Sequence, residues 1–260
     1  MCKPFLKWVG GKRSILNQLK DRLPKEYNVY HEPFLGGGAL FLAEQPKPAI
    51  LSDINLYLII TFIIVRDYPD KLINKLKMYQ ANHSSNHFLQ ARVKLFEETD
   101  PVATAALFIY LNRTCFNGLY RVNKAGLFNV PQGSYKSPKI LDEVNLLAVS
   151  KALQNIDIKC QDFTKIILRP GDFYYFDPPY HGTYQQYSIN GFDDNRHELL
   201  ADYCRAIDDI GGYFMVSNAD TPFIRKLYDG FNIEEIEARR SVSCKAHQRG
   251  KETELIIRNY

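Results

Sequence analysis

The sequence predicts an α/β fold in which an open sheet is interrupted by an insertion and then completed. Residues 28–53 follow the order strand, glycine loop, helix, strand and acidic residue, which is typical of a nucleotide-binding βαβ unit. Residues 56–114 lose the strand pattern and become helical, and strands resume at residue 157. We therefore expect a sheet domain at 1–55 and 139–260 and an insertion at 56–138.

The first βαβ unit predicts the kind of ligand. NVYHEPF, residues 28–34, is expected to be a strand, GGG at 36–38 a loop that enters the helix ALFLAEQ, and KPAILSDIN a second strand ending at Asp53. Asp53 lies 17 residues beyond Gly36, close to the spacing of about 20 at which an acidic residue meets ribose hydroxyls. The loop FLGGG is neither GxGxxG nor GxxxxGK[ST]. It favours a nucleoside without phosphates.

The insertion is expected to be mostly helical. LYLIITFIIV, residues 56–65, is too short for a bilayer, which needs about 20 residues, and is expected to be a buried helix. Asp100 and Pro101 form an N-cap and a first helical residue before VATAALFIYLNR. Between residues 117 and 134, two short β-like runs flank NKAG, which suggests a hairpin that turns at Gly126, away from any core pattern.

The last third of the chain completes the sheet. Strands are expected in DIKCQDF, GDFYYFDPPY and GGYFMVSN, with a helix in NRHELLADYCRAIDDI and a terminal antiparallel pair in IEEIEARRSVSC and ETELIIRNY. The two prolines of DPPY fix φ and remove backbone donors, so the turn could serve only to end a strand. Alternatively, it holds Asp177, the Pro178 carbonyl and Tyr180 at the carboxyl end of a strand, where open α/β sheets bind ligands.

Net charge, cysteine content and histidine spacing limit the partners, compartment and metals to be expected. The 260 residues carry a net charge of +4, which permits a nucleic-acid partner without establishing one. Five scattered cysteines without a CxxC indicate a reducing cytoplasm, and no signal peptide or membrane span is expected. His83 and His87 have helical i, i+4 spacing but no third ligand nearby, so no metal is expected. We expect a monomer.

Several motifs occur in an order that resembles the Dam family of DNA adenine-N6 methyltransferases. They are KWVGGK, EPFLGGG, SDIN, YLNRTCFNGLYRVNKAGLFNVPQGSYKSP and FDPPY, and the resemblance runs from about Phe5 to the C-terminus. It implies a Rossmann-like methyltransferase sheet of the α group, an inserted DNA-recognition domain, and S-adenosylmethionine (AdoMet) as methyl donor. It implies AdoMet contacts from Trp8, Lys12, Phe34, Gly36, Asp53, Ile54 and Asp177. Asp162 is expected to face the adenine of AdoMet.

The resemblance also implies how the target is methylated. Asp177 and the Pro178 carbonyl are expected to accept hydrogen bonds from the adenine amine, and Tyr180 to stack on a base extruded from duplex DNA. The implied DNA contacts are Lys7, Phe116, Asn117, Leu119, Arg121, Pro131 and Tyr135. Arg121 and Lys7 would contact guanines, Leu119 and Pro131 a thymine methyl, and Phe116 and Asn117 the gap left by the adenine. This set indicates GATC.

Two segments depart from or extend this pattern. Several relatives have a tyrosine where Phe116 stands, and HGTYQQYSINGF, residues 181–192, has its own sequence, so phosphate contacts there cannot be inferred. RRSVSCKAHQRGK, residues 239–251, is expected to lie along the DNA backbone, although a solvated loop is the alternative.

Three other functions fit parts of the pattern. The DPPY turn also suits transfer to cytosine N4. The chain could be a DNA-binding module that has lost catalysis, although intact Trp8, Lys12, Asp177 and Tyr180 argue against this. A nicotinamide oxidoreductase fits the βαβ order but lacks GxGxxG.

Overall fold

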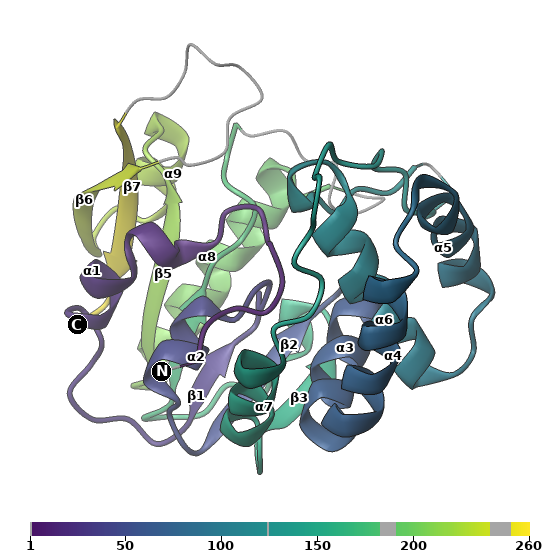
Figure 1. Ribbon diagram of the computed structural model, residues 1–260. Coiled ribbons are helices and arrows are strands. Elements are labelled where there is room, and N and C mark those ends of the chain that lie inside the picture. The colour runs from purple at the N-terminus through teal and green to yellow at the C-terminus, as the bar shows by residue number, and fades with distance from the viewer. Residues whose placement is uncertain (1, 124, 183–190, 240–250) are drawn as a thin grey trace.

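The computed structural model describes residues 2–123, 125–182, 191–239 and 251–260, and within these ranges the chain folds around one seven-stranded sheet (Figure 1). The strand order is β3-β2-β1-β4-β5-β7-β6. The strands are β1 Tyr30–Glu32, β2 Ala49–Asp53, β3 Asp157–Cys160, β4 Phe173–Phe176, β5 Tyr213–Ala219, β6 Asn232–Arg239 and β7 Lys251–Arg258. Each strand predicted for the sheet is present, including the terminal antiparallel pair, so the α/β fold class is confirmed.

Strand direction decides where a ligand can bind. β1 to β5 run parallel, and β7 runs antiparallel to both of its neighbours, β5 and β6. The chain moves outward from β1 through β2 to β3 and then returns to place β4 on the other side of β1. Ligands of open α/β sheets bind at such a switch point, at the carboxyl ends of the strands. Because β7 is reversed, its first residues lie at that same edge.

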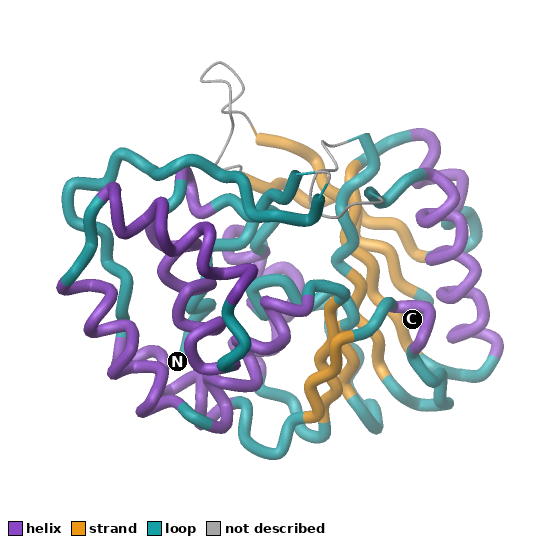
Figure 2. The backbone as a smooth tube through the Cα atoms, turned by 90° about the vertical axis from the view of Figure 1, so that its right-hand side faces the viewer, coloured by secondary structure: helices purple, strands orange, loops and turns teal. Residues whose placement is uncertain are grey.

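Helices cover both faces of the sheet, so the strands lie between two groups of helices (Figure 2). Side chains of β4 alternate between two apolar clusters, with Phe173 and Tyr175 in one and Tyr174 and Phe176 in the other. The helices are α1 Leu16–Lys20, α2 Ala39–Glu44, α3 Leu56–Asp67, α4 Pro69–Ala81, α5 Ser85–Glu97, α6 Pro101–Thr114, α7 Glu143–Ala152, α8 Asp194–Asp209 and α9 Pro222–Leu227. Helices α1, α7 and α9 were not anticipated from the sequence.

Helix α6 is the centre of the helical group at the right of Figure 1. It packs against α3, α4 and α5, and 11 of its 14 residues are buried, so it is enclosed on nearly all sides. Helix α3 packs on α6 and also on β2, β3 and α7, which links this group to the sheet. The division into domains at 1–55, 56–138 and 139–260 therefore stays a prediction.

No helix in the described part of the chain is long and apolar enough to cross a membrane.

The segment that follows α6 reverses direction as predicted, but without regular strands. Val122 and Phe128 form an isolated antiparallel bridge, and Gly126 turns the chain with a φ of +77°. The expectation that this segment lies away from the core is wrong. Tyr120 is 9% exposed and packs against Phe108 and Phe128, because aromatic side chains of the reversal fill the space beside α6.

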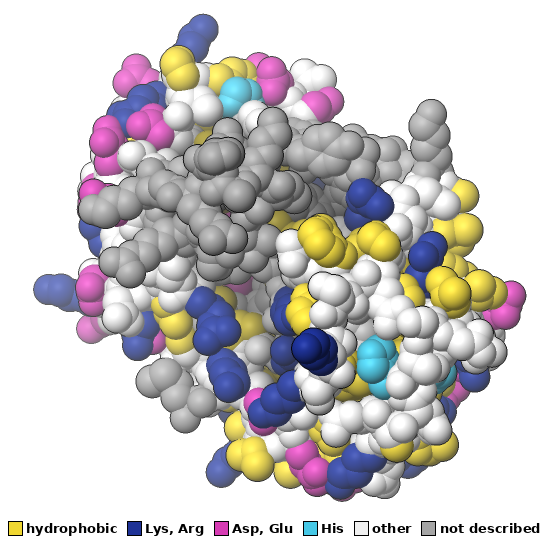
Figure 3. Space-filling view, turned by 45° about the horizontal axis from the view of Figure 1, so that its top comes forward, with side chains coloured by type: hydrophobic (Ala, Val, Ile, Leu, Met, Phe, Trp, Pro, Cys, Tyr) yellow, Lys and Arg dark blue, Asp and Glu magenta, His cyan; other side chains and the backbone are white. Residues whose placement is uncertain are grey.

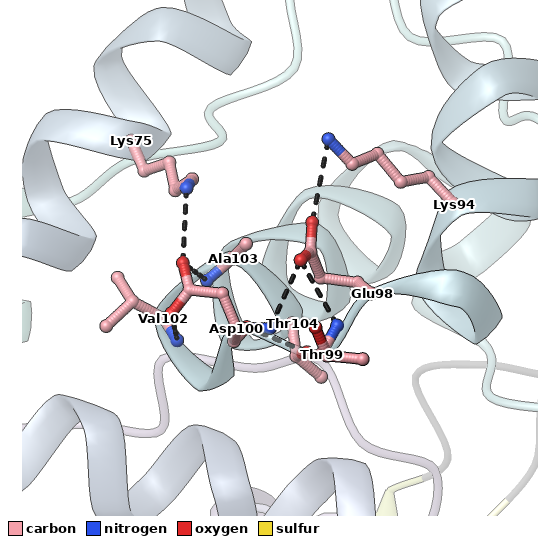
Figure 4. A network of polar contacts seen from close by, with 8 residues as sticks. All are labelled: Lys75, Lys94, Glu98, Thr99, Asp100, Val102, Ala103 and Thr104. Carbon is pink, nitrogen blue, oxygen red and sulfur yellow. Dashed lines mark hydrogen bonds and ion pairs between the residues drawn. The ribbon is translucent and has the colours of Figure 1, made fainter.

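Asp100 caps α6 as predicted, within a network of polar contacts (Figure 4). Its carboxylate accepts hydrogen bonds from the amides of Val102 and Ala103, each at 3.2 Å, and Lys75 Nζ lies 3.4 Å away. Glu98 accepts from the Asp100 amide at 3.1 Å, which fixes the residue that caps the helix. The start of this largely buried helix is thus held by two side-chain carboxylates, that of the cap residue and that of Glu98 before it.

We expect Asp100→Ala to lower the free energy of unfolding by about 0.5–2 kcal/mol, because two helical amides lose their acceptor. Asp100→Asn keeps a capping oxygen but loses the charge facing Lys75, so it should retain most of the stability. Urea unfolding of the three proteins measures both effects. Equal losses for the two variants would contradict the capping role and assign the effect to the ion pair.

Candidate active site

The DPPY turn begins where β4 ends at Phe176, at the edge of the sheet where the parallel strands have their carboxyl ends. The Asp177 carboxylate lies 2.6 Å from Lys12 Nζ, and the same ammonium lies 4.6 Å from the centroid of the Tyr180 ring. Lys12 also donates to the Gly10 carbonyl at 2.7 Å and is only 5% exposed. The structure therefore brings the N-terminal KWVGGK segment and the DPPY turn into direct contact.

The remaining members of the turn are also fixed. Pro178 is buried, and the Tyr180 hydroxyl donates to Glu254 Oε2 at 2.6 Å, from the start of β7. His181 follows, with its backbone amide donating to Asn218 Oδ1 at 3.0 Å and its ring 3.0 Å from the Thr221 hydroxyl. These contacts account for the first residue of the HGTY tract, whereas residues 183–190 lie outside the described part of the chain.

Burial and neighbouring charges tune the carboxyl groups at this edge. Burial raises the pKa of Asp177 to about 6, with the Lys12 ammonium opposing the rise and the Glu254 carboxylate adding to it. Burial also raises the pKa of Glu32 to about 8, so this side chain is largely protonated at neutral pH. Glu32 accepts a hydrogen bond from the Tyr30 hydroxyl at 2.8 Å and supports the start of α2 through the Phe41 amide. At neutral pH, Asp177 is therefore mostly ionised, whereas Glu32 is mostly protonated.

The glycine loop and the end of β2 form a site suited to a nucleoside. Asp53 accepts hydrogen bonds from the amides of Gly36 and Asn55, at 3.0 and 2.9 Å. A phosphate here would meet a carboxylate, and the Gly36 amide is already engaged, whereas hydroxyl groups can still donate to Asp53. Ile54 beside it is 61% exposed and offers an apolar surface for a base. The residues present fit the nucleoside part of AdoMet.

Trp8 and Phe34 border this loop. A Cβ at Gly36, whose φ is +47°, would lie 2.7 Å from Trp8 Cδ1, so only glycine leaves room for the indole ring. Phe34 packs against Phe163, with ring centroids 5.4 Å apart. Asp162 lies next to Phe163, but its carboxylate accepts from the Thr164 amide and hydroxyl and pairs with Arg196. The expectation that Asp162 faces an adenine stays a prediction.

The expected DNA contacts gather on the loop after α6 and on Lys7. Lys7 Nζ donates to the Tyr135 hydroxyl at 3.1 Å and lies 4.3 Å from the centroid of the Tyr135 ring. Phe116 is 46% exposed, and Asn117 beside it is exposed in a left-handed conformation, with a φ of +54°. Figure 3 turns the top of Figure 1 toward the viewer. Lys and Arg side chains gather near the middle of the face that it shows.

The other expected contacts belong to the same loop. Arg121 donates through Nε to Asn129 Oδ1 at 2.7 Å and through a terminal nitrogen to the Asn129 carbonyl at 3.2 Å. Pro131 is exposed, and its carbonyl accepts from the Phe116 amide at 2.8 Å. Leu119 is partly buried against the core, with a carbonyl that accepts from the Cys115 thiol. The loop is thus closed on itself, with polar and aromatic side chains at its surface.

Asn112 organises this surface and was missed by sequence reasoning. Its side chain, 3% exposed, accepts from the Lys7 amide at 2.8 Å and donates to the carbonyls of Lys7 and Gly118, at 2.7 and 3.1 Å. It joins the N-terminal segment to the loop after α6. An asparagine near the end of the apolar helical run ALFIYLNR has poor helix propensity, and that is the signal that could have found it.

One expected feature, the basic segment near the C-terminus, cannot be placed. Most of the basic run at 239–251 lies outside the described residues. Among the residues that are described, no cluster of three His, Cys, Asp or Glu could hold a metal ion. His83 Nδ1 instead lies 2.8 Å from the Tyr110 hydroxyl, and the His87 ring packs against Tyr110.

Known proteins similar to this chain are methyltransferases. Residues 8–242 match the model of the family described as D12 class N6 adenine-specific DNA methyltransferase. The chain is 42% identical to the Type II methyltransferase M.MjaIII of Methanocaldococcus jannaschii, covering 99% of both chains. It is 39% identical to the Type II methyltransferase M1.LlaDCHI of Lactococcus lactis subsp. cremoris, covering 99% of this chain and 95% of that protein. It is 34% identical to the DNA adenine methylase of Haemophilus influenzae, covering 98% and 92%.

Lys12→Gln is expected to raise the pKa of Asp177 above about 6, because the substitution removes the positive charge that favours the carboxylate. Lys12→Arg keeps the charge and should leave the pKa close to its original value. NMR titration of the Asp177 carboxyl carbon in each protein measures the midpoint. An unchanged midpoint in Lys12→Gln would show that the ion pair does not control this group.

Proposed function

The chain belongs to the D12 class N6 adenine-specific DNA methyltransferase family, and from this premise we propose that it methylates an extruded adenine of duplex DNA through the Lys12–Asp177–Tyr180 cluster. Membership implies DNA as substrate and AdoMet as donor, and it sets aside the nicotinamide oxidoreductase. The observation that carries the proposal is the 2.6 Å contact of Asp177 with Lys12 beside the Tyr180 ring. That contact supports the proposal because it keeps a hydrogen-bond acceptor and an aromatic ring together directly after β4.

Asp177 and Pro178 are proposed to prepare the amine. The lone pair of an adenine amine is delocalised into the ring, and hydrogen bonds from its two protons to the Asp177 carboxylate and the Pro178 carbonyl would favour a pyramidal nitrogen. AdoMet, when bound, supplies an electrophilic methyl group on a sulfonium. As the nitrogen received this methyl group it would become more positive, and the preorganised Asp177 carboxylate would stabilise that charge until the methylated nitrogen lost a proton to water. Tyr180 would stack on the base, an interaction of about 1–3 kcal/mol.

The AdoMet contacts are proposed to come from both sides of the glycine loop. Asp53 would accept hydrogen bonds from the ribose hydroxyls, and exposed Ile54 would contact the base. Trp8, Phe34 and Gly36 would form the wall of the pocket, because they pack together or onto the same loop. Lys12, already held against Asp177, would connect this pocket to the catalytic turn.

The loop after α6 is proposed to recognise GATC in duplex DNA. Phe116 and Asn117 project from it and would fill the gap left by the extruded adenine. Arg121 would contact a guanine through O6 and N7, Lys7 and Tyr135 would contact the other half of the site, and Leu119 and Pro131 would contact a thymine methyl. The surrounding helices would form the recognition domain at 56–138. The enzyme would act as a monomer in the prokaryotic cytoplasm, where DNA is found.

Asp177→Ala is expected to lower kcat by about 10²–10³-fold, as loss of one preorganised group at a reaction centre does. Transfer of a labelled methyl group from AdoMet to genomic DNA measures the rate, and digestion to nucleosides identifies the product. Asp70→Ala, an exposed carboxylate on α4, is the control. Labelled cytosine would assign N4 transfer, and AdoMet binding without labelling of any base would support a module that has lost catalysis.

Arg121→Ala is expected to relax recognition of one guanine by about 1–3 kcal/mol, because the bidentate contact is lost. Expression in a host that lacks adenine methylation, followed by sequencing of native DNA with detection of modified bases, measures methylation at GATC and at sites with one changed base. Lys136→Ala, an exposed lysine near the same loop, should affect all sites alike. Methylation at an unrelated sequence would overturn GATC, and unchanged selectivity would overturn the role of Arg121.

A further inference from the structure

We propose that Glu254 is a positioning residue that holds the Tyr180 ring in the orientation in which it stacks on the target adenine. The proposal rests on the proposed function of Tyr180. Its observation is the hydrogen bond from the Tyr180 hydroxyl to Glu254 Oε2 at 2.6 Å, between residues 74 positions apart in the chain. None of the family motifs found in the sequence includes Glu254.

The topology of the sheet explains why Glu254 reaches the turn. β7 is antiparallel to β5, and Glu254 pairs with Ala219, the last residue of β5. The start of β7 therefore lies at the edge where β4 ends and the DPPY turn begins. Side chains alternate along a strand, so Glu254 shares a sheet face with Ile256, which belongs to the same cluster as Tyr175.

The contact constrains a ring that would otherwise rotate. A tyrosine at the end of a turn can rotate about two side-chain dihedrals. A short hydrogen bond to a carboxylate is among the stronger hydrogen bonds in proteins, so it restricts that rotation. Lys12 Nζ lies 4.6 Å from the centroid of the same ring and is itself paired with Asp177. The ring is thus held at its hydroxyl by Glu254 and at one face by Lys12. An aromatic surface fixed in this way loses little freedom when a base stacks on it.

Glu254 has a second effect that an experiment must separate. Its negative charge adds to the rise in the pKa of Asp177, which also faces the Lys12 ammonium. Glu254→Gln removes the charge but keeps an oxygen that can accept from Tyr180, whereas Glu254→Ala removes both. The two substitutions therefore distinguish a hydrogen bond that positions the ring from a charge that acts on Asp177.

The test compares Glu254→Ala, Glu254→Gln, Tyr180→Phe and the double variant Glu254→Ala/Tyr180→Phe in DNA methylation at saturating AdoMet. We expect Glu254→Ala to lower kcat/KM for DNA by about 10- to 100-fold, the range given by loss of a hydrogen bond to a charged group. Glu254→Gln should retain most of the activity. The double variant should be no worse than Tyr180→Phe, because both substitutions break the same contact.

A fluorescent base reports stacking directly, and a carboxylate on the neighbouring strand provides the control. With 2-aminopurine in place of the target adenine, Glu254→Ala should increase the fluorescence of the complex, since stacking quenches it, while AdoMet affinity and Tm stay close to the wild type. Glu235→Gln on the adjacent strand β6, which pairs with Arg225, should leave activity and fluorescence unchanged.

The outcomes separate this inference from the proposed function. An equal loss in Glu254→Gln and Glu254→Ala, or additive losses in the double variant, would overturn positioning through the hydrogen bond. Wild-type activity in Glu254→Ala would also overturn it while leaving DNA methylation intact. Failure of the wild-type protein to methylate any DNA would instead contradict the proposed function itself.

Discussion

The buried ion pair between Lys12 and Asp177 is the interaction on which the arrangement of the site depends. Lys12 is 5% exposed, so its ammonium needs a partner, and the carboxylate 2.6 Å away supplies it. Removing one member of a buried pair leaves an uncompensated charge, which costs far more than the loss of an exposed pair. This ion pair therefore holds the N-terminal segment against the end of β4, and its loss would leave a charge without a partner. Tyr180 joins the pair because the same ammonium lies over its ring.

The sheet supplies this pair with its surroundings. Parallel strands end at one edge, which brings Asp53 from β2 and Asp177 after β4 to the same side of the molecule. The reversed strand β7 adds Glu254 at its beginning. Three carboxyl groups from distant parts of the sequence thus share an edge, and each has a different partner: two backbone amides, an ammonium and a phenol. The chemistry of each group follows from that partner more than from its residue type.

The sequence predicted the fold well because strands and helices have local signals. Alternating or continuous apolar runs marked the strands, and Asp100 with Pro101 marked the start of α6. The site was only partly predictable. The DPPY turn and the glycine loop are motifs, whereas Asn112 and Glu254 are single polar residues in regular elements whose roles arise from tertiary contacts. The burial of Tyr120 was missed for a similar reason, because its partners Trp8 and Phe108 lie elsewhere in the chain.

Close packing links the glycine loop at 36–38 to the loop after α6. Trp8 occupies the position that a side chain at Gly36 would take, and Lys7 occupies the position that a side chain at Gly118 would take, since a Cβ there would lie 2.4 Å from Lys7 Cβ. Two adjacent residues therefore pack against two glycines, one on the glycine loop and one on the loop after α6. Because well-packed contacts of this kind deform little, neither loop can move far without displacing the segment that also carries Lys12.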